Sequence, residues 1–150
     1  PEADGVRAFL YKPKSYAGKK ILMVFHGTLR NAEEYRDHAE GLAERTGMLV
    51  VAPEFPRATY PGWRYNRGVV ADDANVVQPP ATWTYNLVPK IVDAVRRAEG
   101  KPLPWIGIGH SAGGQFVVRM AAFADHGAER LVAANPGSLL FPRTDWTFGY

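Results

Sequence analysis

The sequence predicts an α/β fold, a mostly parallel sheet of about five strands with flanking helices. Two segments, residues 21–25 and 48–52, consist only of apolar residues, which is typical of strands that are buried on both faces of a sheet. Segments in which apolar residues recur at helical spacing separate the predicted strands. Strands that alternate with helices in this way favour a right-handed parallel sheet with helices on both faces.

The amino-terminal part of the chain contains the first two predicted strands. Residues 6–12 alternate loosely between apolar and polar side chains, which indicates a strand with one wetter face. Residues 13–20 have the composition of a loop with turns. The apolar strand at residues 21–25 follows, and it ends at the tripeptide His-Gly-Thr, residues 26–28.

A helix should follow the second strand. Asn31 can cap it, because its side chain can accept from free backbone N–H groups, and Glu34 stands three residues later, as in a capping box. Gly47 is placed to end this helix before the strand at residues 48–52. Residues 53–80 then form a long segment, rich in proline and aromatic residues and without periodicity, and such segments are usually functional or mobile.

The remaining elements complete the alternation. Apolar residues at helical spacing over residues 87–98 predict a second helix, with Asn86 as its cap and Gly100 after its end. The predicted strand, helix and strand that follow are residues 104–108, 114–124 and 130–135. We therefore expect residues 1–150 to form a single α/β domain.

Composition excludes several classes of protein. The 150-residue chain is 46% hydrophobic and 22% charged, which is ordinary for a soluble globular domain. It has no cysteine, which excludes disulfides, thiolate metal sites and a cysteine nucleophile. Its net charge of +3 comes from scattered lysine and arginine residues, which indicates a solvated surface and no nucleic-acid partner.

The sequence does not decide the cellular compartment of the protein. No apolar run approaches the length of a membrane span, and no signal peptide is visible. The chain begins at Pro1 instead of a methionine, so we expect that something precedes it in the natural protein. A soluble cytoplasmic protein and a secreted or periplasmic one both fit.

A Gly-x-Ser-x-Gly pentapeptide, residues 109–113, joins the strand at residues 104–108 to the helix after it. The two glycines let the strand and helix backbones approach each other closely. Ser111 is then held at the tip of a tight turn beside a helix N-terminus, which is the context of a nucleophile elbow. The pattern predicts that Ser111 is a catalytic nucleophile. The alternative is a purely structural glycine turn.

These elements, in this order, resemble the α/β-hydrolase fold over residue 6 to about residue 141. They look closest to polyhydroxyalkanoate-depolymerase-like and feruloyl-esterase-like serine esterases. Such esterases have a similar His-Gly-x strand end, an aromatic loop after the fourth strand, and an ending of the sixth strand like Asn-Pro-Gly at residues 135–137. The resemblance implies hydrolysis of carboxylic esters through an acyl-enzyme at Ser111. It assigns the oxyanion donors to the backbone N–H groups of Thr28 and Ala112.

Four residues are expected to bind substrate: Leu29, Trp63, Tyr65 and His110. Trp63 and Tyr65 lie on the long loop that should overhang the site, where they line an acyl or aromatic pocket or form a structural aromatic cluster. His110 should pack beneath the site, because adjacent residues of an elbow point apart and its ring cannot easily reach the serine hydroxyl.

The resemblance covers only the first part of the fold. In such hydrolases the triad acid and then the histidine follow the serine along the chain, after later strands. No histidine lies beyond His126, which should sit on the wrong side of the sheet. We therefore expect both groups beyond residue 150, and this chain alone to be inactive. Asp145 is a weaker candidate for the acid.

The other titratable residues have simpler interpretations. His26 should fix the oxyanion loop through hydrogen bonds instead of acting as the base, and His38 should be solvated on a helix. Asp72 and Asp73 have no histidine at ligand spacing, so a solvated loop is favoured over a metal site. We expect no metal and no cofactor.

Two other functions compete with the esterase. One is a non-catalytic α/β-hydrolase-like module for binding or assembly that lacks a general base. The other, a flavodoxin-like nucleotide binder, is disfavoured because no Gly-rich phosphate loop follows the first strand. The expected partners are a small-molecule or polymeric ester, and either a second copy or the missing carboxy-terminal half at an exposed sheet edge.

Overall fold

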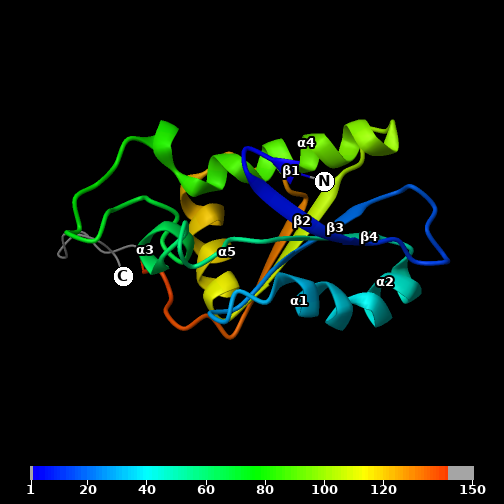
Figure 1. Ribbon diagram of the computed structural model, residues 1–150, viewed down its shortest axis with the longest axis horizontal. Coiled ribbons are helices and arrows are strands. Elements are labelled where there is room, and N and C mark those ends of the chain that lie inside the picture. The colour runs from blue at the N-terminus through cyan, green and yellow to red at the C-terminus, as the bar shows by residue number, and fades with distance from the viewer. Residues whose placement is uncertain (1, 142–150) are drawn as a thin grey trace.

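The computed structural model describes residues 2–141 and shows a six-stranded sheet in the order β1-β2-β4-β3-β5-β6 (Figure 1). The strands are β1 (Glu2–Ala3), β2 (Val6–Tyr11), β3 (Ile21–Phe25), β4 (Leu49–Pro53), β5 (Trp105–His110) and β6 (Arg130–Ala134). The helices are α1 (Ala32–His38), α2 (Glu40–Thr46), α3 (Gly62–Tyr65), α4 (Leu87–Glu99) and α5 (Ala112–Phe123). Two 3-10 turns, Pro80–Thr82 and Thr84–Asn86, precede α4.

The central strands run parallel. β3 pairs in parallel with β4 and β5, and β5 pairs in parallel with β6, whereas β2 is antiparallel to β4 and β1 is antiparallel to β2. This confirms the predicted mostly parallel sheet, a partial α/β-hydrolase fold. The two-residue strand β1 was not predicted, because so short a segment has no apolar pattern.

The register places the functional segments side by side. Phe25 at the end of β3 is paired with Gly109 of β5, and Gly109 is paired with Ala133 of β6. The residues that follow these positions therefore emerge together at the carboxyl edge of the sheet, where ligands bind in open α/β sheets.

Alternate residues of β3 face opposite helical layers, as the pleat of a strand requires. Ile21, Met23 and Phe25 belong to the core shared with α4 and α5. Leu22 and Val24 belong to the second core, which α1 and α2 cover. Figure 1 shows α4 on one side of the sheet and α1 and α2 on the other, so the predicted two-sided cover is confirmed.

The first predicted helix is interrupted at Ala39, where one residue separates α1 from α2. The predicted cap is also wrong, because the side chain of Asn31 makes no capping bond and its Nδ2 donates to the Glu34 carboxylate at 2.6 Å. The helix stops are confirmed, since Gly47 and Gly100 adopt left-handed conformations with φ of 69° and 64°.

The long segment between β4 and α4 folds onto the sheet through aromatic rings. Two of its rings contact Phe116 of α5: the ring centroids of Tyr65 and Phe116 are 5.2 Å apart, and those of Tyr85 and Phe116 are 4.9 Å apart. Within the segment, Phe55 stacks on Tyr65 at 5.0 Å. Gly68 makes room for one of these rings, because a Cβ atom there would lie 2.0 Å from the Tyr85 ring. Among residues 2–141, no helix is both long and apolar enough to cross a membrane.

Gly68→Ala should destabilise the protein. Gly68 has φ +65° and no space for a side chain, so an alanine would be strained and would displace the Tyr85 ring. We expect the free energy of unfolding, measured in urea, to fall by about 2–4 kcal/mol. The control is Gly62→Ala, where a Cβ meets no atom within 4 Å, and a change within about 1 kcal/mol is expected. An equal loss in both variants would contradict this account.

Candidate active site

Ser111 occupies a strained turn between β5 and α5. It is half-buried and has φ 56° and ψ −114°, a region that non-glycine residues rarely adopt. Its N–H donates to the carbonyl of Ala134 at 3.1 Å, and its own carbonyl accepts from Gln115 at 3.0 Å. Such strain persists only where the surrounding structure enforces it, and it is concentrated at functional sites.

The enforcing contacts are between backbones. A Cβ atom at Gly109 would lie 2.1 Å from the carbonyl oxygen of Gly113, and one at Gly113 would lie 2.2 Å from that of Phe25. Gly114 is less tightly restricted, since a Cβ atom there would lie 2.9 Å from the carbonyl oxygen of Ala134. The two glycines of the pentapeptide are therefore required by close packing against β3 and within the turn. The third, Gly114, was missed because it lies outside the pattern.

The segment after β3 lies against this turn. A Cβ atom at Gly27 would lie 3.8 Å from the Cβ of Ser111. Residues 27–30 form a turn in which Arg30 N donates to the carbonyl of Gly27 at 3.2 Å. Thr28 and Leu29 are exposed at its tip, and Leu29 is 78% exposed. Ala112 is buried at the start of α5, where backbone N–H groups have no partner within the helix.

His26 is fully buried and holds the loop through both ring nitrogens. Its Nε2 accepts from the N–H of Phe55 at 3.0 Å, so Nδ1 carries the proton and donates to the carbonyl of Gly27 at 3.0 Å. The Tyr65 hydroxyl donates to the His26 carbonyl at 2.8 Å. Burial lowers the pKa of His26 to about 4, which keeps the ring neutral. The predicted hydrogen-bonding role is confirmed, and neither nitrogen is free to act as a base.

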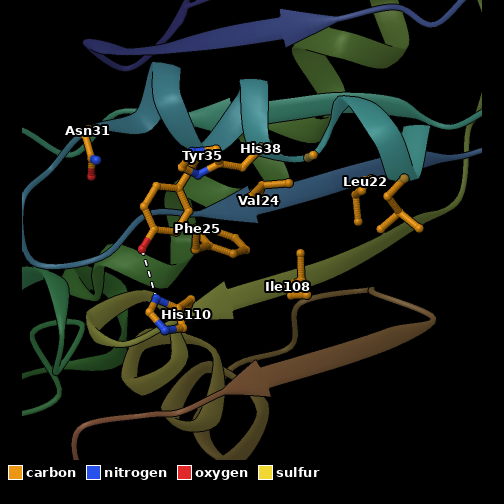
Figure 2. Close-up of a pocket in the computed structure, with 10 residues that line it drawn as sticks. Leu22, Val24, Phe25, Asn31, Tyr35, His38, Ile108 and His110 are labelled. Carbon is orange, nitrogen blue, oxygen red and sulfur yellow. Dashed lines mark hydrogen bonds between the residues drawn. The ribbon is translucent and has the colours of Figure 1, made fainter. Parts of the chain in front are cut away.

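His110 does not pack beneath the site. It is exposed, and its Nδ1 is 3.0 Å from the hydroxyl of Tyr35 (Figure 2). Side chains alternate along β5, so His110 faces the same side as Ile108, toward α1. Both line an apolar pocket of about 500 Å³ between α1 and the sheet. His38, also at this pocket, is exposed as predicted.

His126 lies at the far end of β5. Its Nδ1 accepts from Ala128 N at 2.9 Å, and its ring is 6.3 Å from that of Trp105, the first residue of the strand. Ser111 follows the other end of this six-residue strand, which spans about 16 Å at a rise of about 3.3 Å per residue. None of the chain's four histidines therefore serves Ser111 in the described structure.

The two aromatic residues of the long loop have different environments. Tyr65 is fully buried between Phe55 and Phe116, and burial raises its pKa well above the ordinary value. It supports the His26 loop and has no surface for substrate, which corrects its predicted role. Trp63 is half-buried and lines a cavity of about 480 Å³. Gln115, one turn after Ser111, lines the same cavity.

Asp72 organises a turn, as expected of a loop aspartate. Its Oδ1 accepts from the N–H groups of Ala74 and Val76 at 2.9 Å each, and its Oδ2 accepts from Gln78 at 3.0 Å. Within residues 2–141, no cluster of three or more histidine, aspartate or glutamate side chains could hold a metal ion. Asp145 lies outside the described residues.

Two arginines at the residue 27–30 turn were not predicted. Arg57 Nη2 donates to the carbonyl of Thr28 at 2.7 Å. Arg30 Nη2 donates to the carbonyl of Tyr60 at 2.9 Å, and its guanidinium lies 4.4 Å from the centre of the Tyr65 ring. Their scattered positions in the sequence carry no pattern, so no signal in the sequence could have placed them here.

Two of the solved structures that are similar to this chain cover nearly all of it, and both have the same TM-score. Poly(aspartic acid) hydrolase-1 from Sphingomonas sp. KT-1 is 35% identical with a TM-score of 0.83, over 92% of this chain and 54% of that one. The poly(3-hydroxybutyrate) depolymerase LpqC from Bordetella parapertussis is 34% identical with a TM-score of 0.83, over 93% and 49%. This chain thus spans about half the length of these proteins.

More distant structures share the fold alone. Est1E from Butyrivibrio proteoclasticus, also solved with ferulic acid bound, is 18% identical with a TM-score of 0.54, over 88% of this chain and 48% of that one. No protein-family model and no curated protein matches the chain. The structural neighbours are depolymerases and esterases of the α/β-hydrolase superfamily, which confirms the predicted resemblance.

The buried, neutral His26 should make stability depend on pH. The unfolded chain binds a proton near pH 6.5 that the folded chain accepts only near pH 4, so stability falls as pH is lowered through this window. We expect His26 to account for about 3 kcal/mol of the loss. His26→Gln should lower the free energy of unfolding at pH 7 and flatten its pH dependence, measured by urea denaturation. The matched control is His38→Gln, which removes an exposed histidine, and an unchanged slope in His26→Gln would refute the assignment.

Proposed function

We propose that this chain, a partial α/β-hydrolase fold shared with depolymerases and esterases, belongs to a serine hydrolase that cleaves carboxylic esters through an acyl-enzyme at Ser111. The observation that carries the proposal is the strained turn, in which a non-glycine residue at φ 56° stands between a buried strand and a helix N-terminus. A structural turn would not need a serine there, because glycine would adopt this conformation without strain.

The chemistry follows from the neighbours of Ser111. Its Oγ attacks the ester carbonyl and gives up its proton to a base, and the carbonyl oxygen becomes an oxyanion. The backbone N–H groups of Thr28 and Ala112 are the proposed donors to this oxyanion, each worth about 3–4 kcal/mol. When the intermediate collapses, the ester C–O bond breaks and the leaving alcohol takes the proton from the base. Water then attacks the acyl-enzyme, which releases the carboxylic acid and restores the Ser111 hydroxyl. His26 acts as a positioning residue, since it fixes the loop that carries Thr28.

The base and its carboxylate are proposed to lie beyond residue 150 of the natural polypeptide. Both ring nitrogens of His26 are engaged, His110 faces the other side of the sheet, and His126 is at the far end of β5. The two similar solved structures are about twice as long as this chain. On this proposal, residues 1–150 supply the nucleophile and the oxyanion donors and are inactive alone.

The substrate is proposed to be a polymeric or small carboxylic ester. The exposed Leu29 adjoins Thr28, and the cavity beside Trp63 adjoins the first turn of α5, so both offer surface to an acyl or alcohol group. The two similar proteins are named for poly(aspartic acid) and for poly(3-hydroxybutyrate), which supports a polymer.

The remaining half of the polypeptide is proposed to complete the sheet at β6. In the described part of the chain, β6 pairs only with β5, and its residues are exposed or half-buried. Ile108 of β5 also lines the apolar pocket beside α1 (Figure 2). Unpaired edges and bare apolar surface favour association.

The alternative is a non-catalytic module for binding or assembly. One observation favours it, namely that no histidine serves Ser111 within the described residues. The two functions differ in whether the natural protein has a reactive serine.

A fluorophosphonate probe should label the full-length protein at Ser111, because it reacts only with an activated serine. Ser111→Ala should abolish labelling, whereas Ser15→Ala, which removes an exposed loop hydroxyl, should preserve it. Residues 1–150 alone should be labelled on the order of a thousandfold more slowly than the full-length protein, because they lack the general base. Labelling that survives Ser111→Ala would eliminate the proposed nucleophile, and no labelling of the full-length protein would favour the non-catalytic module.

Residues 1–150 expressed alone should self-associate through the β6 edge, as sedimentation velocity would show. Val132 on β6 is 42% exposed, so Val132→Lys should shift the chain toward monomer by placing a charge on the edge. Val76→Lys is the control, because Val76 is also exposed but lies in the long loop. A monomeric parent chain would contradict the proposed edge.

A further inference from the structure

We infer that Arg57 and Arg30 form a carboxylate-binding subsite beside the oxyanion loop, so that the hydrolase prefers ester substrates that carry a negative charge near the scissile bond. The inference rests on the proposed function and adds a substrate class to it. It is carried by the position of the two guanidinium groups and by the absence of a compensating acid in the described structure.

Both arginines are attached to the turn that is proposed to hold the oxyanion. Arg30 is the last residue of this turn, with φ 65°, and Arg57 donates to the carbonyl of Thr28. The turn itself lies against Ser111, through Gly27. Arg57 is therefore attached to the same loop that lies beside Ser111, and a group bound by Arg57 would lie near an ester carbonyl held at Ser111.

The charge of Arg30 is poorly compensated. Its Nη2 donates to a backbone carbonyl and its guanidinium faces the Tyr65 ring, while its Nε and Nη1 are buried without a hydrogen-bond partner. Burial lowers the pKa of the Arg30 guanidinium, and the positive charge of Arg57 acts in the same direction. An arginine kept only for stability would be expected to have its buried donors satisfied.

No carboxylate pairs with this cluster within residues 2–141. The ion pairs that join two described residues involve other cations, namely Arg7, Lys12, Lys20, Arg36, Lys90 and Arg96. Glu54, the acid after β4, is bound to Arg7. Arg64 extends the basic surface toward Trp63, since its guanidinium lies 5.2 Å and 5.9 Å from the Tyr60 and Trp63 rings.

The two arginines would act differently on a substrate. Arg57 is exposed, and its guanidinium has donors left to bind a carboxylate in the bidentate manner that this group favours. Arg30 is half-buried, so solvent screens its charge less. Its positive charge would attract the same anion through space, without a direct hydrogen bond. An anionic substrate thus supplies the counter-charge that the described chain lacks.

Two matched pairs of esters test the subsite in the full-length protein. On the acyl side, mono-(para-nitrophenyl) adipate and para-nitrophenyl hexanoate have the same chain length and differ in a terminal carboxylate. On the alcohol side, para-carboxyphenyl and para-carbamoylphenyl hexanoate are nearly the same in shape and differ in the charge of the para group. The readout is the ratio of kcat/KM for the charged ester to that for the neutral ester, which cancels any general loss of activity.

In one of the two pairs, Arg57→Gln should lower this ratio roughly tenfold, as expected for loss of a partly solvated hydrogen bond between charged groups. Arg57→Lys should retain part of the ratio, and added salt should reduce it in the parent protein more than in Arg57→Gln. The matched control is Arg97→Gln, which removes an equal charge from the exposed face of α4.

The outcomes separate this inference from the proposed function. Absence of hydrolysis of every ester, together with absence of fluorophosphonate labelling, would overturn the hydrolase itself and the subsite with it. Hydrolysis with ratios that Arg57→Gln leaves unchanged in both pairs, or that Arg97→Gln lowers equally, would overturn the subsite alone.

Discussion

The contact between bare backbones at residues 109–114 is the constraint on which the rest of the site depends. Because Gly113 has no side chain, α5 can start directly against the carbonyl of Phe25, and the turn before it closes on Gly109. This proximity fixes Ser111 in its strained conformation and brings the end of β3 beside it. A side chain at either glycine would push the helix from the sheet and separate the serine from the loop at residue 27.

A buried framework holds the other side of the site. His26 ties its own loop to the segment after β4, and Tyr65 ties the same loop to the aromatic cluster around Phe116 on α5. Neutral His26 and un-ionised Tyr65 can be buried because each polar atom has a partner. The exposed tip at Thr28 is thereby carried by rigid elements, which is what the proposed oxyanion site would require.

Much of the fold and part of the site could be predicted from the sequence. The strands at residues 21–25 and 48–52 and the turn at Ser111 were accessible because their patterns are local: continuous apolar residues, and glycines around a serine. The environment of Tyr65 was not, because Trp63 and Tyr65 lie in one segment without periodicity and only tertiary packing separates them. The side on which His110 projects, and the convergence of Arg30 with Arg57, depend on contacts between distant segments that no local pattern records.

The positive φ of Ser111 sets conformational stability against the proposed chemistry at a single position. Glycine there would relax the backbone and raise the melting temperature, while it would delete the hydroxyl. With Ser111 as the proposed nucleophile, selection for thermal stability alone would favour a more stable but inactive protein, so laboratory evolution of this fold would need a screen for turnover in every round.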